Sequence, residues 1–514
     1  MSNLPIIIQG GMGAGVSNWR LARAVSERGQ LGVVSGTALA HILARRLQDG
    51  DPGGHMRRGL DHCPLPETAE KIWRTYYIPG GKAEHAPFKP VPMPAKDSSR
   101  EYDELCIVAN FVEVFLAREG HDNAVGMNYL EKIQIPHLSS IFGAMLASVD
   151  YVIMGAGIPL KIPGILDRFA NFEAATYPLH VADSLDGDAT MTFAPREFME
   201  RNVPPLVRPK FLAIVASNTL AVTMLRKANG KVDGLVIEGP TAGGHNAPPR
   251  GKLQLSETGE AIYGERDRVD TEAIRALGVP FWLAGGYGTP ERVREALAAG
   301  AAGVQVGTAF ALCVESGLRD DYKQAILQKV ASGEAKVFTD PLCSPTGFPF
   351  KVVQLEGSGS EAKVYLARVR ICDLGYLREA YVRDDGSIGY RCSAEHENIY
   401  ARKAGKPDKT VGRKCICNAL LANIGQSQVR QDGRFEEGLV TAGDDLVGIT
   451  RFMRPDGNTA YNAGDVIAML CSSRAPTEPA DEGLPAPLDF KGFGSHVCRP
   501  ELPTANNELS GPKP

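Results

Sequence analysis

The sequence predicts an α/β protein built on a (β/α)8 barrel, and three observations predict it. Eight short apolar segments rich in β-branched residues recur between residues 5 and 306, as buried strands do. Stretches with helical spacing separate most of them, and the segments lack the alternating polarity of half-exposed strands. Several segments end in glycine, which suits the turns that follow parallel strands. An open doubly wound sheet is the alternative, because the number of strands does not prove that the sheet closes.

The expected strands and helices follow one another along the chain. The strands cover residues 5–9, 31–35, 124–128, 150–154, 210–216, 233–238, 280–284 and 303–306. Helices are expected over 217–227, 270–277, 290–299 and 321–332. Two insertions interrupt this repeat. Residues from about 38 to 123 contain helices and a surface loop, and residues from about 170 to 209 are expected to form a small hairpin.

Three regions are therefore expected: the barrel over 1–335, a smaller mixed extension over 336–474, and a proline-rich tail over 475–514. Within the extension, the turn at Asp385-Gly386 predicts a hairpin. Residues 418–424 have the spacing of a short helix. The segment 340–350 is either a cover over the barrel mouth or a linker.

Composition excludes several classes of protein. Hydrophobic residues make up 43% and charged residues 23% of the 514, as in ordinary globular enzymes. A formal net charge of −4 gives no reason to expect nucleic-acid or membrane-surface binding. No apolar run is long enough to cross a membrane, and no signal segment is recognised at the N-terminus. Ten cysteines in such a chain suggest a reducing compartment, so a cytoplasmic location is expected.

The segment 232–250, VDGLVIEGPTAGGHNAPPR, is the most informative part of the chain. A strand ends in it, and two glycines and a histidine follow. Gly243 and Gly244 have no Cβ, so a bound group can approach the backbone closely. His245 stands at the carboxyl end of a strand, where α/β barrels place their chemistry. It is the candidate catalytic residue, with a structural histidine as the alternative.

These motifs resemble those of the nitronate monooxygenase family, formerly called 2-nitropropane dioxygenases, which includes flavin-dependent enoyl reductases. The resemblance covers roughly residues 1–330. It is carried by PIIIQGGMGAGVS, LGVVSGT, EGPTAGGH and LAGGYGTPERVREALAAGAAGVQVGT. It implies a TIM barrel that binds FMN at the carboxyl ends of its strands. Glu238 departs from the family, whose members usually have glutamine there.

The resemblance also implies which residues bind the cofactor. Gly285, Gly286, Gly307 and Thr308 would hold the FMN phosphate, and glycine turns after the seventh and eighth strands suit an anion. The remaining implied contacts to the flavin or its surroundings are Gln9, Gly10, Gly11, Met12, Asn128, Glu238, Gly243 and Gly244. For Met12 and Asn128, packing and loop hydrogen bonding are the respective alternatives.

The extension is rich in cysteine. Cys372, Cys392, Cys415 and Cys417 are candidate ligands for zinc or an iron–sulfur cluster, since thiolates from separate loops can bind either. Only one close pair exists, and it is Cys-x-Cys, so reduced buried thiols are the alternative.

The expected function is that of an FMN-dependent oxidoreductase of the nitronate monooxygenase type. It would oxidise a small anionic or acidic substrate, and oxygen would reoxidise the flavin. Two alternatives stay open: an NAD(P)H-dependent enoyl-thioester reductase, and a flavin-bound module that binds a partner protein in a biosynthetic assembly. A homo-oligomer is also left open.

Overall fold

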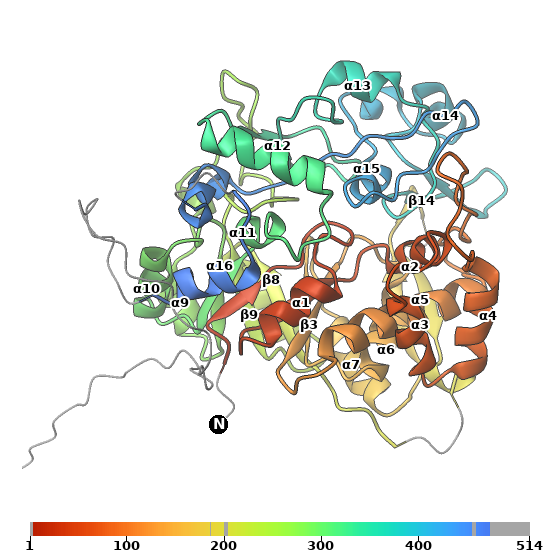
Figure 1. Cartoon of the computed structure of the whole chain (residues 1–514), viewed down its shortest axis with the longest axis horizontal. Helices are drawn as coiled ribbons and strands as arrows, with labels where there is room; N and C mark the ends of the chain where they lie inside the picture. The colour runs from red at the N-terminus through yellow and green to blue at the C-terminus, as the bar shows by residue number, and fades with distance from the viewer. Residues whose placement is uncertain (1–3, 186, 200–203, 455–458, 473–514) are drawn as a thin grey trace, which may run out of the picture. The chain divides into compact units, whose positions relative to one another are not determined.

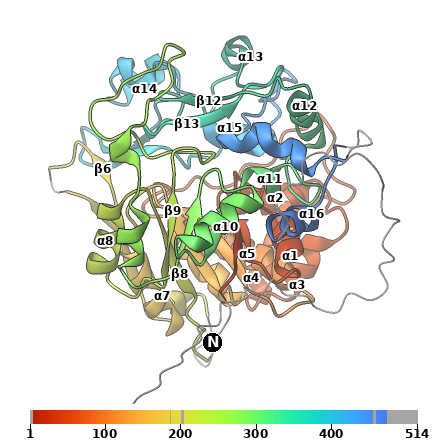
Figure 2. The same cartoon turned by 90° about the vertical axis from the view of Figure 1, so that its left-hand side faces the viewer.

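The computed structural model describes residues 4–185, 187–199, 204–454 and 459–472, and these form one compact unit. The predicted tail over 475–514 lies outside the described residues. Figure 1 shows the elements, and Figure 2 shows the same chain turned by 90°.

All eight predicted strands form one parallel sheet. In spatial order they are β1 (Ile7–Gln9), β11 (Gly303–Val306), β10 (Phe281–Ala284), β9 (Gly234–Glu238), β8 (Lys210–Val215), β4 (Tyr151–Gly155), β3 (Val125–Leu130) and β2 (Gly32–Ser35). The sheet closes because Ile8 forms a parallel bridge with Leu31 beside β2. Gln9 N donates to Leu31 O at 2.9 Å, and Leu31 N donates to Ile7 O at 3.0 Å. The predicted (β/α)8 barrel is therefore confirmed, and the alternative of an open sheet is excluded.

The two faces of the strands pack differently. Alternate strand residues such as Ile8, Ile153 and Val236 form an apolar cluster of their own, and this cluster fills the barrel. The opposite faces, including Val34 and Phe211, pack against the surrounding helices in the main core. Both faces are thus buried, which explains why the strands lack alternating polarity.

The helices around the barrel begin with good N-terminal caps in several cases. Ser217 Oγ accepts from Leu220 N at the start of α8, and Thr289 Oγ1 caps α10. The helices of this region are α1 (Trp19–Ser26), α2 (Leu39–Gln48), α3 (His55–Asp61), α4 (Pro66–Tyr76), α5 (Arg100–Arg118), α6 (His137–Leu146), α7 (Ile162–Ala170), α8 (Asn218–Lys227), α9 (Thr271–Arg275), α10 (Pro290–Ala298), α11 (Thr308–Ala311) and α12 (Asp320–Ala331).

The first insertion contributes more to the barrel than the sequence suggested. Its last helix, α5, packs against α1, α2, α3 and α6, so it takes the place of the helix after the second strand. The second insertion forms the predicted hairpin, in which β5 (Ala175–Leu179) pairs antiparallel with β7 (Ala189–Phe193).

Residues 337–422 of the extension lie on one side of the barrel strands in both views (Figures 1 and 2), whereas α16 (Ala463–Leu470) packs beside the barrel helices α1 and α10. It contains the predicted hairpin, β14 (Glu379–Val382) with β15 (Ile388–Arg391), and the predicted short helix, α15 (Ile416–Ala422). Strand β6 (Val181–Ala182) of the second insertion pairs with β14, which joins barrel and extension. The other elements are β12 (Val337–Asp340), β13 (Phe350–Val353), α13 (Ala362–Ala367), α14 (Glu397–Arg402) and α16 (Ala463–Leu470).

Among the described residues, no helix has both the length and the apolar character needed to span a bilayer.

Candidate functional site

The main cavity lies at the carboxyl ends of the barrel strands. Its volume is about 220 Å³, against about 20 Å³ for the small cavity behind Tyr129, so it has room for a ligand. The residues that line it include His245 and all the predicted cofactor residues except Gln9. These are Gly10, Gly11, Met12, Asn128, Glu238, Gly243, Gly244, Gly285, Gly286, Gly307 and Thr308.

Gln9 lies behind the residues that line the cavity. Its side chain is fully buried, and its amide bonds Ser17 Oγ at 2.9 Å and accepts from Val33 N at 3.0 Å. The residue therefore supports the glycine turn after β1 rather than lining the cavity.

In the glycine turns after β10 and β1, Gly285 and Gly11 leave no room for a side chain. Gly285 and Gly286 have φ of 89° and 75°, a region that favours glycine. A Cβ at Gly285 would lie 2.9 Å from Thr241 Oγ1, and one at Gly11 would lie 2.3 Å from Asn128 Cβ. The backbone is thus exposed to the cavity where the sequence predicts a flavin phosphate and ring, and the site fits such a group in this respect.

One acidic group lies beside the predicted phosphate turns, and no sequence motif pointed to it. The carboxyl of Asp445 bonds the Thr308 hydroxyl, and burial raises the pKa of Asp445. Gly443 N also donates to Thr308 Oγ1, at 3.0 Å. The nearby guanidinium of Arg451 donates to Gly288 O at 2.7 Å and partly offsets this negative charge.

His245 is fixed by the extension. Its Nε2 lies 2.7 Å from Ser344 Oγ, and its ring meets that of Phe350 edge-on at 4.8 Å between centroids. Lys351 N donates to Gly244 O at 2.9 Å, so β13 runs alongside the Gly-Gly-His segment. Burial and the charge of Lys132 hold the pKa of His245 well below its usual range. The imidazole is therefore neutral near pH 7 and can accept a proton or donate one.

Lys132, in the loop after β3, faces Glu238 at the end of β9. Burial lowers the pKa of Lys132 to about 7, although the nearby carboxylates of Glu238 and Glu131 oppose this. Burial also raises the pKa of Glu238 to about 7, and Lys132 opposes that shift. The two groups therefore change protonation close to neutral pH. Sequence reasoning selected Glu238 but missed Lys132, because a lysine in a loop resembles any solvated amine.

The extension supplies the far wall of the cavity. Apolar side chains from it reach the space, namely Phe350, Leu377, Ile416, Leu420 and Val440. The segment 340–350 thus covers the barrel mouth. The structure therefore supports the predicted role of a cover rather than that of a linker. The cavity has a glycine-rich end at the barrel turns and an apolar end at the extension.

Among the residues it describes, the structure does not show the metal site predicted in the extension, which stays a prediction. In the part of the chain that the structure describes, no group of three or more His, Cys, Asp or Glu is arranged to hold a metal ion. Cys372, Cys392, Cys415 and Cys417 do influence one another electrostatically, but burial raises the pKa of each thiol. Cys417 lines the apolar end of the cavity.

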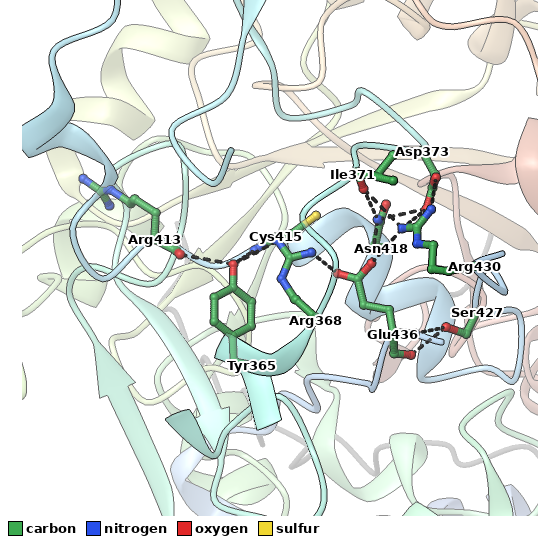
Figure 3. Close-up of polar contacts among 10 residues, drawn as sticks. All are labelled: Tyr365, Arg368, Ile371, Asp373, Arg413, Cys415, Asn418, Ser427, Arg430 and Glu436. Carbon is green, nitrogen blue, oxygen red and sulfur yellow. Dashed lines mark hydrogen bonds and ion pairs between the residues drawn. The ribbon is translucent and has the colours of Figure 1, made fainter. Parts of the chain in front are cut away.

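A buried charge network holds the extension together instead (Figure 3). Arg430 donates to both carboxylate oxygens of Asp373 at 2.8 Å, and Arg368 donates to Glu436 at 2.5 Å. The amide of Asn418, on α15, links the two acids at 3.0 Å and 2.8 Å. Two positive and two negative side chains compensate one another here, so helix α15 is anchored behind the cavity wall.

Fold and site together define a class: a (β/α)8-barrel enzyme whose glycine-lined cavity has room for a ligand beside a neutral histidine. Comparison with known proteins shows which family part of the chain is similar to. Residues 191–339 match the family model described as nitronate monooxygenase. The resemblance predicted from the sequence is confirmed, and the chain is related to this family of flavin-type oxidoreductases.

Relatives match over part of their length. A probable nitronate monooxygenase from Bacillus subtilis is 37% identical over 22% of this chain and 31% of its own. A nitronate monooxygenase from Pseudomonas aeruginosa is 35% identical over 26% of this chain and 37% of its own length. The chain thus spans about a third of the length of these curated relatives. Among solved structures, the enoyl reductase domain of MlnA from Bacillus amyloliquefaciens is 13% identical with a TM-score of 0.45, covering 90% of this chain and 92% of that one.

Proposed function

We propose that the protein is an FMN-dependent oxidoreductase of the nitronate monooxygenase type, acting on a small anionic or acidic substrate, with oxygen as the final electron acceptor. One observation carries the proposal. The residues implied as cofactor contacts, except Gln9, come from five strand ends and meet His245 around one cavity. When bound, the flavin would supply the electron-accepting group that no amino-acid side chain offers.

Each part of the site has a role in this proposal. Backbone amides at Gly285, Gly286 and Gly307 would hold the phosphate, where no Cβ intervenes. His245, neutral at pH 7, would take a proton from the substrate or orient its oxygen. Lys132 supplies positive charge close to His245, which favours an anionic substrate. Phe350 and the other apolar groups of the extension would exclude water.

The cofactor is tested by the visible spectrum of the purified full-length protein before and after acid release. Flavin bands, with a released flavin that migrates as FMN, are expected. Colourless protein that takes up no added FMN would refute the proposal. The catalytic role is tested by His245→Ala with propyl-2-nitronate as substrate. We expect turnover to fall by about 100-fold or more, as for loss of a general base, with FMN still bound. His85→Ala, in the surface loop of the first insertion, is the matched control.

A second candidate, an NAD(P)H-dependent enoyl-thioester reductase, is favoured by the apolar end of the cavity. Such a wall suits an acyl chain better than a small nitronate. A relative from Mycobacterium tuberculosis, 30% identical over 164 residues and 41% of its length, is named as a carboxyl-CoA dehydrogenase and acts on a thioester by that name. Anaerobic mixing of the FMN-loaded protein with NADPH separates the candidates, because rapid bleaching of the flavin favours the reductase. Flavin that stays oxidised with NADPH but is reduced by propyl-2-nitronate favours the first proposal.

A further inference from the structure

Two hydroxyl groups of the extension connect His245 with a buried amine. His245 Nε2 lies 2.7 Å from Ser344 Oγ, and Ser344 Oγ lies 2.8 Å from Thr346 Oγ1. Thr346 Oγ1 is 3.5 Å from Lys132 Nζ. Every step is within hydrogen-bonding distance, although the last is long. The Lys132 amine also lies 3.8 Å from the centroid of the Phe348 ring. This cation–π contact helps to hold the amine beside Thr346.

We propose that Lys132 exchanges a proton with His245 through the hydroxyls of Thr346 and Ser344. This inference rests on the proposed function, in which His245 moves a proton at the substrate. His245 is the catalytic residue, whereas Lys132, Thr346 and Ser344 act through it as positioning residues.

The donors and acceptors allow one consistent direction. A charged lysine has three N–H groups and no acceptor, so Lys132 must donate to Thr346 Oγ1. Ser344 Oγ accepts from Thr346 N at 3.2 Å, which leaves its own hydrogen for His245 Nε2. Nε2 of the neutral ring is then the acceptor, and the other ring nitrogen carries the hydrogen.

The proton count balances at every group. When His245 gives a proton to the substrate, it takes one from Ser344, which takes one from Thr346, which takes one from Lys132. Each hydroxyl ends with the single proton it had at the start, and the amine becomes neutral. The reverse transfer starts from a neutral Lys132 and from the ring tautomer with its hydrogen on Nε2. When the other ring nitrogen then takes a proton from the substrate, Nε2 gives its proton to Ser344, the following steps run in reverse, and Lys132 becomes charged.

The charges around Lys132 suit an amine that gains and loses a proton. The Lys132 amine lies near Glu131 of its own loop, Glu238 at the end of β9 and His245 in the turn after β9. Glu131 is already engaged by the hydroxyl of Tyr177, which donates to it at 3.0 Å. Burial lowers the pKa of Lys132 to about 7, so the amine can change protonation near neutral pH.

The first test measures His245 directly and does not depend on turnover. The full-length FMN-loaded protein is labelled with ¹⁵N-histidine, and the His245 signal among the ten histidines is assigned with His245→Gln. In the wild type, Nε2 should show the shift of an unprotonated acceptor, and Ser344→Ala should change that shift. Lys132→Met should raise the pKa of His245 by about one unit, because a nearby positive charge is removed. An unchanged His245 signal in both variants would overturn the proposal.

The second test measures the proton path. Thr346→Val removes the hydroxyl at nearly constant volume, whereas Thr346→Ser keeps it. The assay uses propyl-2-nitronate, or crotonyl-CoA with NADPH, according to which of them the wild type turns over. Thr346→Val should lower kcat about tenfold with little change in KM, because a positioned proton transfer contributes at least this much to the rate. Thr346→Ser should restore the rate. Equal kcat in Thr346→Val and wild type, or no rescue by Thr346→Ser, would overturn the path. If neither substrate is turned over, the proposed function fails, and the NMR comparison still decides whether Lys132 and Ser344 act on His245.

Discussion

His245 Nε2 lies 2.7 Å from Ser344 Oγ, although 99 residues separate the two in the chain. The imidazole comes from a barrel turn, and the hydroxyl comes from the segment that covers the barrel mouth. The contact therefore makes the extension part of the site, because it decides which ring nitrogen of His245 carries a hydrogen. The same segment closes the cavity on the apolar side.

The turn after β10 is expected to be essential for flavin binding. Gly285→Ala places a Cβ 2.9 Å from Thr241 Oγ1 and strains a backbone with φ of 89°. We expect the Kd for FMN to rise at least tenfold, measured by quenching of flavin fluorescence. Gly278→Ala is the matched control, since it has φ of 75° and open space around the added atom. Both variants carry backbone strain of about 1–3 kcal/mol, but only Gly285→Ala should lose FMN.

Asp445 is expected to oppose the flavin phosphate. Its carboxyl bonds Thr308, which the proposal places at the phosphate, and its charge repels a dianion. Asp445→Asn should therefore lower the Kd for FMN about tenfold, which corresponds to a few kcal/mol or less for a screened charge pair. Burial raises the pKa of Asp445, so wild type and variant should converge at low pH, where the carboxyl is neutral, and diverge as pH rises. Equal affinities at pH 8 would contradict the assigned position of the phosphate.

The charge network of the extension is expected to stabilise the fold. Glu436→Leu removes the carboxylate partner of Arg368, whereas Arg430 and Asn418 keep their contacts with Asp373. Removing one member of a buried ion pair costs about 3–5 kcal/mol of unfolding free energy. A clear drop in Tm is expected by differential scanning calorimetry. Asp432→Leu is the control, because Asp432 pairs with Arg434 on the exposed surface and its loss should leave Tm unchanged. Equal Tm values for the two variants would contradict a structural role for the network.

His137 is expected to make the fold less stable in acid. Its Nε2 is paired with Leu130 O at 3.0 Å, and burial lowers its pKa from 6.5 to about 4. Between these values the unfolded chain binds a proton that the folded chain does not. The free energy of unfolding thus falls as pH drops from 6.5 to 4, by up to about 1.4 kcal/mol per pH unit. His137→Gln should flatten this slope in urea titrations, whereas His62→Gln, on the exposed end of α3, should not. A steeper or unchanged slope in His137→Gln would show that other groups control acid stability.

The sequence by itself determined the eight strands, the glycine turns and the place of His245. These features are local. A short apolar run ending in glycine, as at Phe281–Ala284 followed by Gly285, has few other ways to fold. The turn at Asp385-Gly386 also placed the hairpin of β14 with β15, and helical spacing placed the helix α15.

Only the tertiary structure decided how the extension serves the site. Closure of the sheet needs the contact of Ile8 with Leu31, and the cover needs Ser344 to reach His245. The cysteine pattern suggested a metal site, but whether thiols converge depends on how their loops pack, and here a network around Arg368 and Glu436 stabilises the region instead. Contacts across long separations arise from packing that no local pattern encodes. The sequence did not point to Lys132 for the same reason. Burial lowers the pKa of its amine, and this burial arises from the tertiary structure rather than from its neighbours in the chain.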